Sequence, residues 1–344
     1  MLPELCIGLA ILCITAYAVL GSADFGAGFW DLTAGGAKRG GPVRGMVQHS
    51  MSPVWEANHV WLIFVLVIVW TAFPVAFGSI FSTLSIPLFL AALGIIFRGT
   101  AFVLRGQAAT INEARGLGAL FALASVLIPF CLGAAIGGVA SGRVPVGNAA
   151  GNMWSSWTGP TSVLIGVLGV LTGAYLAAVF LAGDSLRAGQ PDLVRAFRAR
   201  ALGAGMLAGV VAVGGLFVLR GDSRHLYDGL TSGGGLAMVI VSALAGAVTL
   251  ALVWAERYGP ARLTSALAVA AIVVGWALAQ DPYLLPGELT LEQAAAPDAV
   301  LSVVLISMAI GALILAPSLW LLYRLTLQGR LDKEYAPLDQ RFRP

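Results

Sequence analysis

An uncharged run of 38 consecutive residues, 60–97, is the feature that most limits how this chain can fold. As one helix this run would measure about 57 Å, whereas the hydrocarbon layer of a membrane is roughly 30 Å thick. The sequence "FPVAFGS" at 73–79 interrupts it with Pro74 and Gly78, residues that are typical of turns. The run therefore predicts two membrane-spanning helices joined as a hairpin.

The rest of the chain has the same character, with 58% hydrophobic and only 11% charged residues, where a soluble domain carries roughly 25% charged residues. The first twenty residues lack a basic n-region and a small-residue cleavage site, so we expect a permanent first span rather than a cleaved signal peptide. We expect nine spans, near residues 4–27, 54–73, 79–101, 117–140, 161–183, 201–219, 235–255, 263–280 and 299–323.

The basic residues predict the orientation of these spans, because cytoplasmic loops carry an excess of Lys and Arg. If the N-terminus faces outside, sixteen of the twenty basic residues lie on the inner side, and only Arg143, Arg220 and Arg224 lie on the outer side. The remaining one, Arg98, lies near a helix end. We therefore expect an outside N-terminus and a cytoplasmic C-terminus.

No loop is long enough to form a soluble domain, so we expect one transmembrane domain over residues 1–344. "AYAVLGSAD" at 16–24 resembles "AYLAAVFLAGD" at 174–184, which suggests two four-helix bundles, 1–140 and 160–280, with a peripheral ninth helix at 299–323. Chance similarity between helices rich in Ala, Gly and Leu explains the likeness equally well. The predicted fold class is an all-α integral membrane protein.

Four ionisable groups at membrane depth are the candidate functional residues, because such groups are costly there. Asp24 lies about 28 Å along the first span, near the inner surface. Glu56 begins the second span from the same side, and His59 lies one turn deeper on nearly the same helix face. Arg98 ends the third span on that side. Three helices therefore bring polar groups to one notch in the inner leaflet.

Two interpretations of this notch are compatible with each other. In the structural one, Glu56 and Arg98 form an ion pair, and Asn58 and His59 hydrogen-bond to neighbouring helices. In the functional one, Glu56, Asp24 and His59 pass protons inward from the cytoplasmic surface.

The sequence offers no means of binding a cofactor or nucleic acid. A haem held by two histidines needs them on two helices at matching depth, and His49, His59 and His225 form no such pair. The cysteines, Cys6, Cys13 and Cys131, show no metal-binding spacing and suit packing. No P-loop or dinucleotide fingerprint occurs, and the net charge of +3 is too small to predict nucleic-acid binding. We therefore expect no metal site and no catalytic residue in this chain.

Several motifs together resemble subunit II of the cytochrome bd-type quinol oxidases. They are "ADFGAGFWDL" at 23–32, "SMSPVWEANHVWLI" at 50–63, "FP" at 73–74 and "FRG" at 97–99. The resemblance implies a complex with a haem-bearing subunit I, which holds haems b and d, while subunit II binds no haem. Such a complex oxidises quinol, reduces O₂ to water and generates a proton-motive force. Some members hold a structural quinone in subunit II. Small accessory subunits can also belong to the complex.

The resemblance also implies roles for individual residues. Glu56 matches the acidic motif position assigned to proton uptake, Asp24 matches the second aspartate of D-G-F-D-[LM]-G, and Arg98 matches an F-R pair. The first aspartate of that motif is Gly21 in this chain, so a proton path here must run through Glu56, His59 or water.

Three further residues of the resemblance, Trp55, Asn58 and Trp61, match motif positions that look structural. We expect this chain to stabilise subunit I and to supply part of a proton-uptake path from the cytoplasm. The alternative is a secondary transporter subunit, which would place its polar site near the bilayer midplane.

Overall fold

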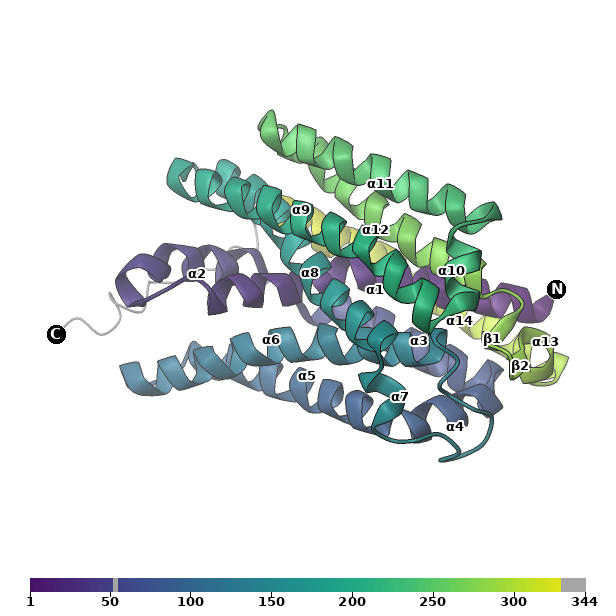
Figure 1. Ribbon diagram of the computed structural model, residues 1–344. Helices are drawn as coiled ribbons and strands as arrows, with labels where there is room; N and C mark the ends of the chain where they lie inside the picture. The colour runs from purple at the N-terminus through teal and green to yellow at the C-terminus, as the bar shows by residue number, and fades with distance from the viewer. Residues whose placement is uncertain (52–54, 329–344) are drawn as a thin grey trace.

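The computed structural model describes residues 1–51 and 55–328, and within them nine helices are long and apolar enough to span a membrane. Figure 1 shows them running side by side through one elongated bundle. The nine are α1 (Leu2–Leu32), α3 (Trp55–Ala72), α5 (Ser85–Arg105), α6 (Ile111–Ala140), α8 (Pro160–Arg187), α9 (Pro191–Asp222), α11 (Gly233–Trp254), α12 (Tyr258–Gln280) and α14 (Asp298–Leu327). The predicted all-α membrane fold is confirmed.

Short elements close the two ends of the bundle, which we call the Met1 end and the Leu32 end after the limits of α1. The Met1 end carries most of them (Figure 1): α4 (Pro74–Thr83), α7 (Ser155–Thr158), α10 (Arg224–Leu230), α13 (Leu291–Ala294) and the antiparallel strands β1 (Tyr283–Leu285) and β2 (Leu289–Thr290). Helix α2 (Ala37–Met51) lies at the Leu32 end. The Leu32 end is the one predicted to face the cytoplasm.

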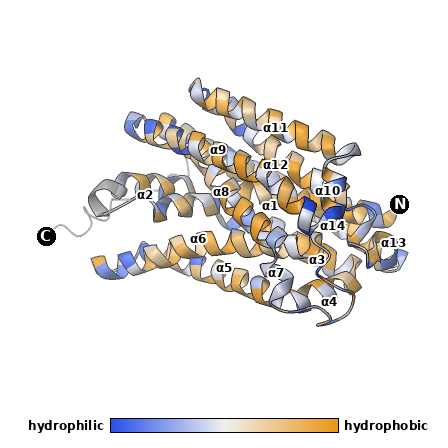
Figure 2. Ribbon diagram, in the orientation of Figure 1, coloured by the Kyte–Doolittle hydropathy of each residue, from blue (hydrophilic) through white to orange (hydrophobic). Residues whose placement is uncertain are grey.

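Hydrophobic residues cover the middle of the bundle, and hydrophilic residues gather towards the helix ends, as Figure 2 shows. This distribution is the one that a lipid environment selects, because a helix satisfies its own backbone hydrogen bonds and exposes only apolar side chains to lipid. The predicted span limits were short at several ends, since charged terminal turns continue as helix beyond the apolar stretch.

Glycines bring α1 and α8 into direct backbone contact near the centre of the molecule. A Cβ added at Gly26 would overlap the carbonyl oxygen of Gly173, and one added at Gly173 would lie 2.7 Å from the carbonyl oxygen of Ser22. Small residues permit such close approach in membranes, where van der Waals packing replaces the hydrophobic effect. The glycine-rich end of α1 therefore fixes α1 against α8.

The third span begins at Ser85 rather than at residue 79, which corrects the predicted limit. Residues 74–83 form the separate helix α4, with Pro74 in its first turn, where a missing N–H has no consequence. The polar face of α4 explains why it is not part of the span. Ser79, Ser82 and Thr83 accept hydrogen bonds from backbone N–H groups of the loop at 147–151.

Helix α2 was not predicted. Its glycines and Pro42 indicated a loop, yet Val43, Met46, Val47 and Met51 are all buried in the main core cluster. Their spacing of three and four residues is the helical signal that could have identified it. The expected capping of α3 by Ser52 and Pro53 lies outside the described residues.

Helix α14 packs along one side of the bundle against α1 and α3. Seven of its large apolar side chains are exposed, among them Leu313 and Ile314. At the Met1 end the Ala296 N–H donates to the Ala72 carbonyl over 2.8 Å, which ties the start of α14 to the end of α3.

Candidate functional site

Asp24 is buried in the bundle, and an amide binds one of its two carboxylate oxygens. Asn58 Nδ2 donates to Asp24 Oδ2 over 2.6 Å and lies 3.5 Å from the Leu20 carbonyl. Because a carbonyl oxygen only accepts, this pair of contacts places the NH₂ group of Asn58 towards α1. Asn58 Oδ1 then accepts from the Tyr323 hydroxyl over 2.8 Å. Helices α1, α3 and α14 therefore meet in one hydrogen-bonded row.

Asp24 lies farther from the helix end than predicted. Because α1 continues to Leu32, the carboxyl group is about 12 Å, or eight residues, from that end. Only 6% of the Asp24 surface is exposed.

Arg98 is almost completely buried beside Asp24, at 1% exposure, yet it forms no salt bridge in the described part of the chain. Its Nε donates to Ser125 Oγ over 3.1 Å, and its Nη2 donates to the backbone carbonyl of Asp24 over 3.0 Å. The guanidinium also lies 5.0 Å from the ring centroid of Phe25 and 5.1 Å from that of Phe121. Such cation–π contacts suit an arginine in an apolar setting.

The predicted ion pair between Glu56 and Arg98 is wrong for the described residues. Glu56 is exposed, whereas Asn58 on the same helix is buried. Two residues advance a helix by about 200°, so Glu56 points away from the side of α3 that meets α1. Glu56 is an acid on the surface of this chain and was wrongly expected to be buried.

His59 is half-buried in α3, directly after Asn58. Its Nδ1 is 3.0 Å from the Trp55 carbonyl oxygen, so Nδ1 carries the proton in this contact. The rings of Tyr17, Phe25 and Trp55 stand edge-on to the imidazole at centroid distances of 6.0 to 6.3 Å. His59 therefore packs against Phe25, the residue that follows Asp24 in α1.

Trp55 and Trp61 pack between helices. Trp55 lies against Phe102, and its ring would be 3.3 Å from a Cβ added at Gly99, so α3 and α5 approach closely there. Trp61 contacts Phe64, and its buried indole Nε1 has no hydrogen-bond partner among the described residues.

A second buried aspartate, Asp31, lies two turns farther along the same face of α1, and sequence reasoning missed it. Its Oδ2 accepts from Arg105 Nη1 over 2.5 Å, and its Oδ1 accepts from Arg44 Nε over 2.9 Å. Asp31 and Arg105 are each 4% exposed. The signal was the spacing, since Asp31 follows Asp24 by seven residues and Arg105 follows Arg98 by seven.

His59 and His225 lie in different parts of the described structure. His225 lies at the Met1 end against Tyr283, whereas His59 lies in α3 with aromatic rings on three sides. No group of three or more His, Cys, Asp or Glu residues in the described chain could hold a metal ion.

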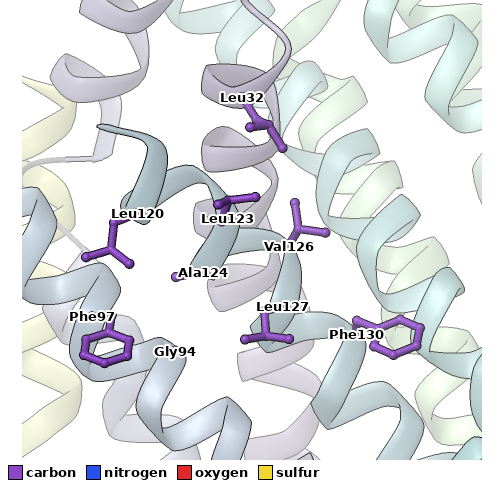
Figure 3. Close-up of a pocket in the computed structure, with 9 residues that line it drawn as sticks. All are labelled: Leu32, Gly94, Phe97, Leu120, Leu123, Ala124, Val126, Leu127 and Phe130. Carbon is purple, nitrogen blue, oxygen red and sulfur yellow. The ribbon is translucent and has the colours of Figure 1, made fainter. Parts of the chain in front are cut away.

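An apolar cavity of about 460 Å³ lies where α1, α5 and α6 meet (Figure 3). Leu32, Gly94 and Phe97 line it together with six residues of α6: Leu120, Leu123, Ala124, Val126, Leu127 and Phe130. None of these side chains can donate, accept or transfer a proton. The cavity is therefore separate from the polar row at Asp24.

Comparisons with known proteins match these features to one family. The model of the family "Cytochrome bd terminal oxidase subunit II" matches residues 2–326. A Bacillus subtilis (strain 168) protein with the provisional name cytochrome bd menaquinol oxidase subunit II is 26% identical over 62% of this chain. That alignment spans 61% of the relative's own length.

A solved structure gives a longer match. The bd oxidase from Geobacillus thermodenitrificans contains a chain that is 26% identical, with a TM-score of 0.76 over 95% of this chain and 98% of that one. The sequence left two alternatives open, an oxidase subunit II and a secondary transporter subunit. The family model and the solved structure both match nearly the whole chain, and both favour the oxidase subunit. This multi-pass bacterial membrane protein belongs to the cytochrome bd terminal oxidase subunit II family.

Proposed function

We propose that this chain is the haem-free subunit of a quinol:oxygen oxidoreductase and supplies part of its proton-uptake path. Reduction of O₂ to water consumes protons, which must reach a site inside the membrane. The complex would join this chain to a haem-bearing subunit I, with haems b and d in that partner and quinol and O₂ as substrates. The same chain would support the fold of the partner, and lipid acyl chains suit the apolar cavity in Figure 3.

The buried carboxyl group of Asp24 is the observation that carries the proposal. One oxygen is held by Asn58, and the nearby cation, Arg98, is bound to the backbone carbonyl and Ser125 rather than to the carboxylate. A carboxylate without a salt bridge in an apolar bundle can exist in either protonation state without breaking an ion pair. Such a group can take up and release a proton during turnover.

Glu56 and His59 extend the proposed path towards the surface. Glu56 is exposed in the first turn of α3, where it can collect a proton from water or from the surface of the partner. His59 follows one turn deeper, with Nδ1 bound to Trp55 and the other ring nitrogen available for exchange. Asp24 would receive the proton through bound water.

Substitution of Asp24→Asn in the purified two-subunit complex tests the proposal. Asparagine keeps the shape of the side chain but cannot carry the proton, so we expect at least a tenfold loss of quinol-dependent oxygen consumption. The haem difference spectrum should stay unchanged. The control is Asp192→Asn, which removes an 88% exposed carboxylate and should leave turnover as in the native complex.

Normal turnover in Asp24→Asn with normal haem content would remove Asp24 from the path. Glu56→Gln tests whether Glu56 is the entry of the proton path. We expect a smaller loss of oxygen consumption than for Asp24→Asn, because surface water can partly replace an exposed acid.

A further inference from the structure

Tyr17 lies on the same face of α1 as Asp24, seven residues or about 10 Å closer to the Met1 end. Its ring covers Gly21. A Cβ added at Gly21 would lie 2.8 Å from Tyr17 Cε2 and 2.9 Å from Cδ2. The tyrosine ring thus fills the space that a side chain at position 21 would need.

The Tyr17 hydroxyl is buried and has no hydrogen-bond partner in the described residues. The residue is 9% exposed. A buried hydroxyl normally finds a partner, and where protein atoms offer none a bound water takes that role. This hydroxyl therefore points to a water site inside the bundle.

A second unpaired donor belongs to the same region. Trp61 packs against the small cluster formed by Tyr17, Phe25, Ala124 and Ile128, and its Nε1 is buried without a partner in the described chain. An indole N–H only donates, whereas a hydroxyl donates and accepts. Water can satisfy both groups.

The charged and titratable groups nearest to Tyr17 are those of the proposed path. The Arg98 guanidinium lies 5.0 Å from the centroid of the Phe25 ring, which itself packs edge-on to the Tyr17 ring at 6.1 Å. The His59 ring lies edge-on to the tyrosine ring at a centroid distance of 6.0 Å. The unpaired hydroxyl is therefore on the deeper side of the polar row, towards the membrane centre.

We propose that the Tyr17 hydroxyl binds water and is the next member of the proton path beyond Asp24. This extension rests on the function proposed above. Asn58 occupies Asp24 Oδ2, so the proton leaves from Oδ1 to a bound water. Tyr17 holds this water through a hydrogen bond and keeps its own proton, and the proton from Asp24 moves on through the bound water. The hydroxyl supplies a polar group at the level where Gly21 supplies none.

Tyr17→Phe in the intact complex isolates the hydroxyl, because phenylalanine keeps the ring over Gly21. We expect a fall in oxygen consumption of about fivefold or more, with unchanged haem content and unchanged KM for quinol. The carboxyl stretching band of Asp24, identified by its absence in Asp24→Asn, should shift in the infrared difference spectrum. Loss of a purely structural hydroxyl that has no protein partner would change neither quantity.

Tyr258→Phe is the matched control, since Tyr258 is also buried and its hydroxyl also lacks a partner among the described residues. The Tyr258→Phe complex should match the native complex in oxygen consumption and in the Asp24 carboxyl band. If Asp24→Asn slows turnover while Tyr17→Phe leaves both turnover and the infrared band unchanged, the extension is wrong and the proposed function stands. If neither variant slows turnover, the proposed function itself fails.

Discussion

Two aspartate–arginine pairs on the same two helices have opposite electrostatic arrangements. Asp31 binds Arg105 and Arg44 directly through both carboxylate oxygens. Asp24, two turns deeper, binds only the amide of Asn58, and its neighbour Arg98 forms hydrogen bonds elsewhere. The same residue types at the same seven-residue spacing thus give one closed ion cluster and one carboxylate without a salt bridge.

This difference suits Asp31 to a structural role and Asp24 to the proton exchange proposed above. The Asp31 carboxylate is the shared partner of Arg105 and Arg44 at the Leu32 end, so its charge is needed to hold the two arginines in place. Asp24 can be protonated without breaking an ion pair. The cluster at Asp31 therefore joins α1, α2 and α5, while Asp24 is the group to which we assign proton exchange in the proposed function.

The largest expected effect on stability comes from Asp31→Asn. Removal of this charge leaves Arg105 buried without its partner, and breaking a buried ion pair in this way costs about 3–5 kcal/mol. We expect a clear fall in the unfolding temperature of the complex in detergent. Asp192→Asn, at an exposed pair, should be neutral. Equal stability of the two variants would show that the cluster at Asp31 does not hold the helices.

Gly26→Ala should have the next largest effect, because both pairs depend on the position of α1 against α8. The added methyl overlaps the Gly173 carbonyl, and overpacking typically costs about 1–3 kcal/mol. Gly8→Ala adds the same methyl to α1 where nothing lies within 4 Å, so it should be neutral or slightly stabilising. Thermal unfolding of the Gly26→Ala and Gly8→Ala complexes, without chemical denaturant, compares their unfolding temperatures. Equal unfolding temperatures would contradict the close crossing.

Asp24→Asn should have the smallest effect on stability. The variant loses no ion pair, and its amide oxygen can still accept from Asn58, so we expect a change of about 1 kcal/mol or less, below that of Gly26→Ala and Asp31→Asn. A thermal unfolding curve of each complex gives the comparison directly. A greater loss for Asp24→Asn than for Asp31→Asn would reverse the roles assigned to the two aspartates.

Much of the fold follows from the sequence, because hydropathy over twenty residues reports directly on membrane spans. All nine predicted spans are present in the described residues. Helix α2 was missed because glycines and Pro42 concealed its apolar spacing. The start of the third span was placed too early because α4 is largely apolar as well, so the break between α4 and α5 at Leu84 does not show in the hydropathy.

The site was only partly predictable. Asp24 and Arg98, which the sequence marked as ionisable groups within spans, are both buried in the bundle. The rotation of α3, which turns Glu56 outwards and Asn58 inwards, depends on where α1 packs. The contact of Asn58 with Tyr323 joins residues 265 positions apart, and no local pattern signals it. Proton roles for Glu56, Asp24 and His59 stay predictions.

Proton uptake during a single turnover tests the central claim most directly. The fully reduced complex is mixed with O₂ in weakly buffered solution, and a pH-sensitive dye and the haem absorbance are followed together. We predict that Asp24→Asn binds O₂ at the native rate, while proton uptake and the oxidation step that depends on it slow together. Uptake at the native rate and extent in Asp24→Asn would contradict the account.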